Sequence, residues 1–372
     1  MSFIYNMIVF LVLISSIYEF ITGEEPNKNL FKTIVVIMIF TAGLAYGLSP
    51  DWVAYWTAFE DVSMTSFSEL KELSRYWDME YGYILLNKLI SSIGLGYATF
   101  TLLIAIIAIS LKTMVIFRYG GYVFLALLMY IVPTYFFEEH VHVRQGLASA
   151  IMFFSIRFII ERNLWKFLLC FVIAFYFHKA VVAFLFAYWI VKIPFNNLLI
   201  ISAVGGAMLA YLIGLSTVVD GIFRLLPFGV GEAYSDYANE FTEKSILGDI
   251  VKVLTVIAIL LFNKKVEEKD DLFAYFRNIY LFGVIIYFFF GEGIFAARLP
   301  GFFTVYIIFV VPRMVKALSD TPLFKNFVYI MFTVYTLALY INFYNVWGDK
   351  SGFGRYTTVF NDRAVYGFFQ KY

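Results

Sequence analysis

Charge and cysteine are both scarce in this chain of 372 residues. Charged residues make up only 15% of it, and the single cysteine, Cys170, lies within an apolar run. A lone cysteine excludes an intramolecular disulfide and argues against thiol catalysis. The net charge of +1, with no extended basic block, excludes the basic surface that nucleic-acid binding needs. Walker A, dinucleotide-binding and GxSxG motifs are also missing, so ATP hydrolysis is not expected.

Apolar residues dominate the sequence instead. They form 62% of the chain, its mean hydropathy is +0.80, and aromatic residues alone account for 21%. A soluble domain is only about half apolar and about a quarter charged. The composition therefore predicts an all-α, polytopic bundle of transmembrane helices, with aromatic side chains facing lipid and lining its interfaces.

Apolar runs long enough to cross a hydrocarbon core recur along the whole chain. The first run has neither a basic leader nor a small-residue cleavage site, so we expect it to be retained as a span. No repeat or low-complexity linker divides the sequence, which favours a single integral membrane domain over residues 1–372. We predict about twelve spans, within a range of about 10–14, at 2–21, 31–48, 97–117, 121–137, 143–160, 164–177, 179–193, 197–216, 249–263, 272–290, 295–312 and 325–345.

The basic residues fall in alternate, short connections, which the positive-inside rule assigns to the cytoplasm. Lys112 and Arg118 are placed in one of these connections. The opposite, extracytoplasmic face then receives loops near 49–80 and 217–248, the tail 346–372 and both chain termini. That face is rich in acidic and aromatic residues and holds every histidine.

The segment 133–179 concentrates polar groups in an otherwise oily chain, including all three histidines. Polar groups cost several kcal/mol each to bury in hydrocarbon, so their concentration indicates a wet cavity at the outer face. If the corner EEHVHVRQ is helical, His140 and Arg144 share one face of that helix. The other face then carries an acid, an imidazole and an amide, namely Glu138, His142 and Gln145.

Two arginines are candidates for binding an anion at this face. Arg144 is crowded by a glutamine and an acid pair, although a snorkelling interfacial arginine would give the same pattern. Arg298 is flanked by small residues in FAARLPGF, which leave room for a ligand. His178 ends an apolar span, where it either caps the helix or takes part in proton transfer.

The histidines do not have the spacing of a metal site. Imidazoles beside carboxylates suit zinc, but no HExxH motif is present and the usual ligand spacings are missing. We therefore expect no metal and no other cofactor.

The first outer loop combines aromatic rings with carboxylates. Asp51, Glu80 and Tyr83 lie in or directly after it, and a semi-apolar stretch at 81–93 is expected to form a re-entrant or interfacial helix. Flat rings cover the apolar faces of sugars while acids accept hydrogen bonds from their hydroxyls, so the composition suits carbohydrate. An aromatic belt at a membrane interface has the same composition, and Glu80 is then a rim acid.

These features together resemble the EpsG-like family of Wzy-type polysaccharide polymerases, which join lipid-linked repeat units into O-antigen, capsule or exopolysaccharide. The likeness rests on the acid of a DWVAYW-type outer loop, MEYGYILLNKLI, RQGLASAIMFFS after an acidic corner, AFYFHKAVVAFL and AARLPGFF. It extends from Asp51 to about Pro312, and the tail beyond it matches none of these motifs. RQGLA and FHKA together are more specific than either motif alone.

The resemblance implies a polytopic glycosyltransferase of the bacterial inner membrane whose active site faces the periplasm. Donor and acceptor would both be oligosaccharides linked to undecaprenyl diphosphate, and bilayer lipids and a chain-length regulator would be further partners. The acceptor hydroxyl would displace the lipid diphosphate without a metal. Arg144 and Arg298 would hold the diphosphate, and His178, Glu80 or Glu139, in that order, would accept the proton. Other substrate contacts would come from Asp51, Tyr83, His140, His142 and Gln145.

Two rival functions fit parts of the same sequence. A polytopic transporter or flippase for a polar or lipid-linked solute would also have about twelve spans and an outer polar cluster. Against it, the ionisable residues collect at one face and the two halves of the chain do not repeat. A ligase or single-sugar transferase acting on the same lipid-linked donors is the third interpretation.

Overall fold

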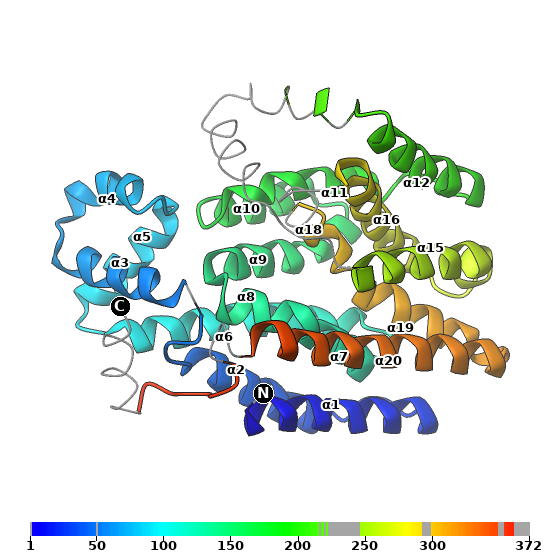
Figure 1. The fold of residues 1–372 in the computed structure, drawn as a ribbon, viewed down its shortest axis with the longest axis horizontal. Coiled ribbons are helices and arrows are strands. Elements are labelled where there is room, and N and C mark those ends of the chain that lie inside the picture. The colour runs from blue at the N-terminus through cyan, green and yellow to red at the C-terminus, as the bar shows by residue number, and fades with distance from the viewer. Residues whose placement is uncertain are drawn as a thin grey trace. The chain divides into compact units, whose positions relative to one another are not determined.

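The structure is a computed structural model that describes residues 2–49, 51–215, 217–218, 221, 246–291, 299–348 and 353–360. Within these residues every regular element is a helix, apart from one isolated β-bridge (Figure 1). Among the described residues, seven helices are long and apolar enough to cross a membrane, and three shorter apolar helices accompany them. The predicted all-α membrane bundle is therefore confirmed as a class, whereas the count of about twelve spans is not confirmed.

The chain forms two compact units. The first unit contains residues 1–157, 165–181 and 336–372, and the second contains residues 158–164 and 182–335. The long helix α20, Pro322–Trp347, contributes its last part to the first unit.

Besides the last part of α20, the described residues of the first unit form twelve helical segments. Helix α2 packs against α6, α1 against α7, and α3 against α5. The segments are α1 Phe3–Thr22, α2 Lys28–Gly43, α3 Trp52–Met64, η1 Phe67–Glu69, α4 Leu70–Tyr76, α5 Tyr81–Ser92, α6 Tyr97–Tyr119, α7 Val123–Tyr130, η2 Ile131–Tyr135, α8 Phe136–His140, α9 Val143–Ile160 and α10 Leu164–Phe175.

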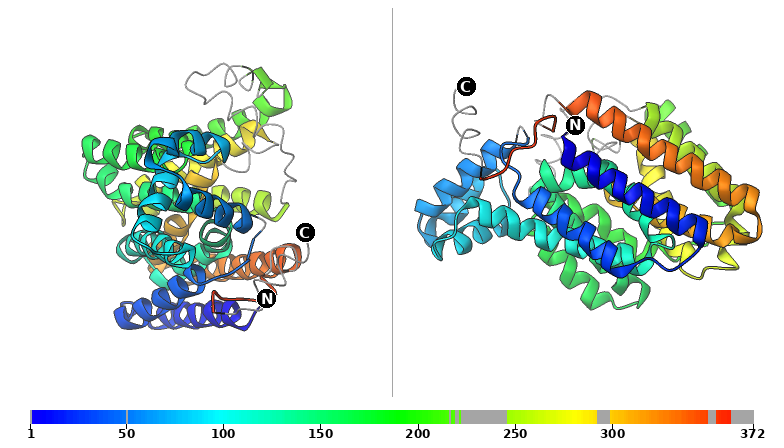
Figure 2. Two further views of the ribbon diagram at one scale, coloured as in Figure 1. Left: turned by 90° about the vertical axis from the view of Figure 1, so that its left-hand side faces the viewer. Right: turned by 90° about the horizontal axis from the view of Figure 1, so that it is seen from below.

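Helices α3, α4 and α5 gather at one end of the first unit (Figures 1 and 2). Buried positions recur three or four residues apart along α3, as in an amphipathic helix that packs on one side. They join side chains of α5 and the first half of α6 in one apolar cluster that includes Phe59, Tyr83 and Phe100. The predicted outer loop 49–80 is thus mostly helical, and the semi-apolar stretch after it is helix α5.

The acidic corner between α8 and α9 is not one continuous helix. Helix α8 ends at His140, where the N–H groups of Val141 and His142 both donate to the carbonyl oxygen of Phe137. Helix α9 begins anew at Val143. The conditional prediction that His140 and Arg144 share one helical face is therefore wrong, because the helix axis breaks between them.

The described part of the tail lies beside the start of the chain. The N–H of Ser2 donates to the carbonyl oxygen of Phe353 at 3.1 Å, and Thr358 forms an antiparallel bridge with Ala45 at the end of α2. Phe353 is fully buried against the ring of Tyr5. The two ends of the described chain are therefore neighbours.

The second unit is held at one end by a polar network between α15 and α16. Arg277, almost fully buried, donates to Glu267 and Asn263 of α15, and Asn278 donates to three backbone carbonyls at the end of α11. The described helices of the second unit are η3 Lys179–Phe186, α11 Ala187–Ile190, α12 Asn197–Leu212, α15 Ile246–Glu267, α16 Phe273–Phe290, α18 Gly301–Thr304, α19 Ile307–Ala317 and η4 Leu318–Asp320, with α20 as far as Tyr335.

Candidate functional site

The carboxylate of Glu80 contacts two other predicted site residues of the first unit, Arg144 and His178. Arg144 donates from Nη1 to Oε2 of Glu80 at 2.6 Å. The other oxygen, Oε1, lies 3.1 Å from Nδ1 of His178 and accepts the backbone N–H of Lys179 at 3.1 Å. Arg144 and His178, which follow Glu80 by 64 and 98 residues in the chain, thus both meet it at the start of α5.

The electrostatics of Glu80 follow from these contacts. Burial alone would raise the pKa of its carboxyl group, but the hydrogen bond from His178 and the charge of Arg144 outweigh burial and lower that pKa to about 2. The carboxylate is therefore ionised at neutral pH. Its contribution to stability is present above the ordinary pKa of 4.5 and is lost only as the pH falls towards about 2.

The guanidinium of Arg144 keeps part of its donor capacity. Nη1 also donates to the carbonyl oxygen of Asp78 at 3.2 Å, and the guanidinium carbon lies 5.7 Å from the ring centroid of Tyr55. Nε is buried without a partner among the described residues. The side chain is 19% exposed. Arg144 is thus fixed in place and still able to bind a further acceptor.

A tight turn presents the Asp78 carbonyl and Glu80 to Arg144. Asp78 has a left-handed backbone with φ +47°, which aspartate tolerates better than most residues. The hydroxyl of Ser74 donates to the carbonyl oxygen of Met79 at 2.6 Å, and the indole of Trp77 donates to Asp61 of α3 at 3.1 Å. The turn is therefore tied to α4, which precedes it, and to α3.

Gly82 allows α5 to approach the end of α10 closely enough for Glu80 to reach His178. Its N–H donates to the carbonyl oxygen of Tyr176 at 2.9 Å, and a Cβ at this position would lie only 2.6 Å from that oxygen. The glycine in MEYGY is thus a packing requirement.

Gly82→Ala is therefore expected to destabilise the protein by about 1–3 kcal/mol, the usual cost of inserting a methylene into a packed site. The measurement is the shift in thermal unfolding temperature of the purified protein in detergent. Gly205→Ala on α12 is the matched control, because a Cβ there would meet nothing within 4 Å. Equal unfolding temperatures for Gly82→Ala and the unmodified protein would show that this approach is not tight.

The remaining polar residues of the predicted site divide between the rim and the interior. Asp51 and His142 form a partly exposed pair, with 3.5 Å between Oδ2 and Nδ1, and Gln145 is also partly exposed at the start of α9. Tyr83 and His140 are buried instead. His140 has its Nδ1 3.2 Å from the carbonyl oxygen of Tyr135, and burial lowers the pKa of its ring to about 4.

A second buried ionic group lies around Lys112, inside α6. Its ammonium is 2.5 Å from a carboxylate oxygen of Glu138 and 2.5 Å from one of Glu139. Glu139 also accepts a hydrogen bond from the hydroxyl of Tyr130 at 3.0 Å. The prediction that placed Lys112 in a cytoplasmic connection is wrong, because the residue is 1% exposed within a 23-residue helix.

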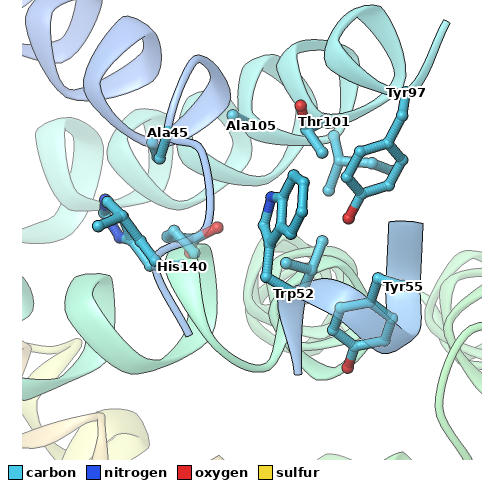
Figure 3. Close-up of a pocket in the computed structure, with 12 residues that line it drawn as sticks. Ala45, Trp52, Tyr55, Tyr97, Thr101, Ala105 and His140 are labelled. Atoms are coloured by element: carbon cyan, nitrogen blue, oxygen red, sulfur yellow. The ribbon is translucent and has the colours of Figure 1, made fainter. Parts of the chain in front are cut away.

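A small cavity of about 30 Å³ lies between α2, α3, α6 and α8 (Figure 3). Such a volume holds one or two water molecules, so an oligosaccharide cannot enter it. Trp52 and Tyr55 line one side of it and His140 another. Glu139 lines it too, and Tyr55 links the cavity wall to Arg144 through their ring contact.

The three histidines have different neighbours, since His140 contacts aromatic rings, His142 faces Asp51 and His178 faces Glu80. In the part of the chain that the structure describes, no three His, Cys, Asp or Glu side chains could jointly hold a metal ion. Arg298 lies outside the described residues, as does most of the predicted loop 217–248.

Some polar residues of the first unit were not predicted. Glu19 of α1 is buried, and its two oxygens accept the N–H groups of Val123 and Phe124 at 2.8 Å each, which stabilises the start of α7. Like Lys112, it is a charged residue inside an apolar run. Such isolated charges are the sequence signal that could have identified both.

Comparison with curated proteins and with solved structures found no significant match. The family model described as the EpsG family matches residues 28–358, a range that contains Glu80, Arg144 and His178 and most of the chain. The resemblance seen in the sequence motifs is thereby confirmed, and the chain belongs to the EpsG family.

Proposed function

We propose that this protein polymerises polysaccharide repeat units at the periplasmic face of the bacterial inner membrane. The donor is an oligosaccharide linked to undecaprenyl diphosphate, and the acceptor is a second lipid-linked oligosaccharide. Membership of the EpsG family supports a polymerase of the membrane. The observation that carries the proposal is that Glu80 holds a fixed cation and an imidazole on its two oxygens.

The proposed reaction is a single displacement at the anomeric carbon of the donor. The acceptor hydroxyl forms the new glycosidic bond, the bond to the lipid diphosphate breaks, and the anomeric centre inverts. Arg144, together with Arg298, stabilises the charge that develops on the diphosphate. A diphosphate leaves readily once its charge is stabilised, so the chemistry requires no metal.

His178 is the proposed acceptor of the hydroxyl proton. Its Nδ1 faces Glu80, which leaves Nε2 as the nitrogen that can take a proton. Glu80 itself is a weaker choice, because a carboxyl group with a pKa of about 2 holds a proton poorly at neutral pH. Its role is to orient the imidazole and stabilise the imidazolium, as the carboxylate of a catalytic triad does.

Glu139 is the third candidate base and is already paired with Lys112. The remaining predicted substrate contacts stay proposals, and they differ in how accessible their side chains are. Asp51, His142 and Gln145 are accessible for sugar hydroxyls, whereas Tyr83 and His140 act through the packing of the site. A chain-length regulator remains an expected partner.

The test of the proposed function is the length of the surface glycan in a strain that lacks this gene. Loss of a polymerase leaves single repeat units on the lipid anchor, whereas loss of a flippase removes them altogether. Single repeat units, restored to long chains by the intact gene, are the expected result. Loss of every unit would support the transporter, and long chains retained on the carrier would support a ligase.

A further inference from the structure

The ionic group around Lys112 has one more carboxylate than cation. Lys112 comes from α6, and Glu138 and Glu139 are neighbours on α8. Both acids approach the same ammonium nitrogen at 2.5 Å. Among the described residues, Lys112 is the only cation within ion-pairing distance of either acid.

All three side chains are removed from solvent. The side chains of Lys112 and Glu139 are each 2% exposed, and that of Glu138 is 15% exposed. An uncompensated carboxylate is costly to bury, and the cost is greatest next to a membrane-spanning helix. Two carboxylates that share one site do not both remain ionised, because protonation of one removes their repulsion.

The other titratable groups that the structure describes around the pair supply no second positive charge. Tyr130 of α7 donates its hydroxyl to Glu139, and Tyr135 lies on the adjoining segment η2. His140, next in the chain, is buried with its Nδ1 at a backbone carbonyl. Burial disfavours the charged form of its ring, so it adds no cation.

We propose that Glu138 and Glu139 form a proton-binding site that holds one shared proton at neutral pH. With that proton the group has one ammonium, one carboxylate and one carboxylic acid, and its net charge is zero. The ligand is a proton. This site does not depend on the proposed polymerase activity.

A small cavity adjoins one of the two acids. Glu139 lines the cavity shown in Figure 3, which has room for one or two water molecules. Tyr55 lines the same cavity, and its ring centroid lies 5.7 Å from the guanidinium carbon of Arg144. The cavity therefore leaves room for a water molecule beside Glu139.

Infrared spectroscopy of the purified full-length protein in detergent tests the proposal directly. A protonated carboxylic acid has a carbonyl stretch that is separate from the bands of a carboxylate and shifts in deuterium oxide. At neutral pH the intact protein is expected to show such a band. Glu139→Gln and Glu138→Gln are each expected to lose it, because one acid and one lysine remain as a neutral ion pair.

Glu72→Gln is the matched control, since Glu72 is an exposed acid of α4 and its replacement should leave the band unchanged. Lys112→Met should strengthen the band, because both acids then take up protons. An intact protein without the band, or a band that survives in both Glu139→Gln and Glu138→Gln, would overturn the proposal. Neither result depends on whether glycans are polymerised.

Discussion

Replacing Arg144 by alanine is expected to reduce polymerisation by about 10²–10³-fold, the usual effect of losing one group that stabilises developing negative charge. Arg144 is anchored through Nη1 to Glu80 and the Asp78 carbonyl, and its Nε stays unpartnered among the described residues. It therefore offers a fixed positive charge to the departing diphosphate. The measurement is the glycan length distribution, with the amount of the variant in the membrane determined in parallel.

Two further variants separate the charge of Arg144 from its structural role. Arg144→Lys keeps the charge but not the planar guanidinium, so partial activity is expected. Arg75→Ala is the matched control, because Arg75 is an exposed arginine of α4 at the same end of the first unit. Glycans of normal length from an Arg144→Ala strain would exclude the diphosphate role. If Arg144→Ala is missing from the membrane, the glycan length of the Arg144→Lys strain decides instead.

The sequence predicts the members of the site better than their arrangement. Glu80, Arg144 and His178 were each selected because a polar group stood at the end of an apolar run on one face. The structure brings all three together. What the sequence could not supply is that Glu80 is the shared partner, since this depends on the turn at Asp78 and on the contact between Gly82 and α10.

The two wrong predictions, a continuous helix through EEHVHV and Lys112 in a connection, also have physical causes. Helix α8 ends at His140 without a glycine or proline in EEHVHV to mark the break, so a continuous helix was the natural expectation. Lys112 was assigned to a connection because a rule that counts basic residues treats a lysine as a flank of a span. Its partners lie 26 and 27 residues later, and only tertiary folding brings them to it.

Lys112→Met is expected to lower the free energy of unfolding by about 3–5 kcal/mol, the usual cost of removing one partner from a buried ion pair. Glu138 and Glu139 then lose the one cation that pairs with them among the described residues, and both must take up protons to avoid a buried charge. Glu139→Gln should cost much less, because Lys112 keeps Glu138 as a counter-charge and the shared proton is no longer needed. Thermal unfolding in detergent measures both shifts, and Lys71→Met on the exposed face of α4 serves as the control.

The contrast between these two variants decides how the ionic group is held. A group with balanced charge should lose similar stability whichever partner is removed, since either change leaves an unpaired charge. A group with an excess acid loses far more when its lysine is replaced. Equal shifts for Lys112→Met and Glu139→Gln would therefore contradict the charge imbalance and the bound proton together. A large shift for Lys112→Met alone would mean that one lysine fixes α8, and with it the start of α9, from which Arg144 extends towards Glu80.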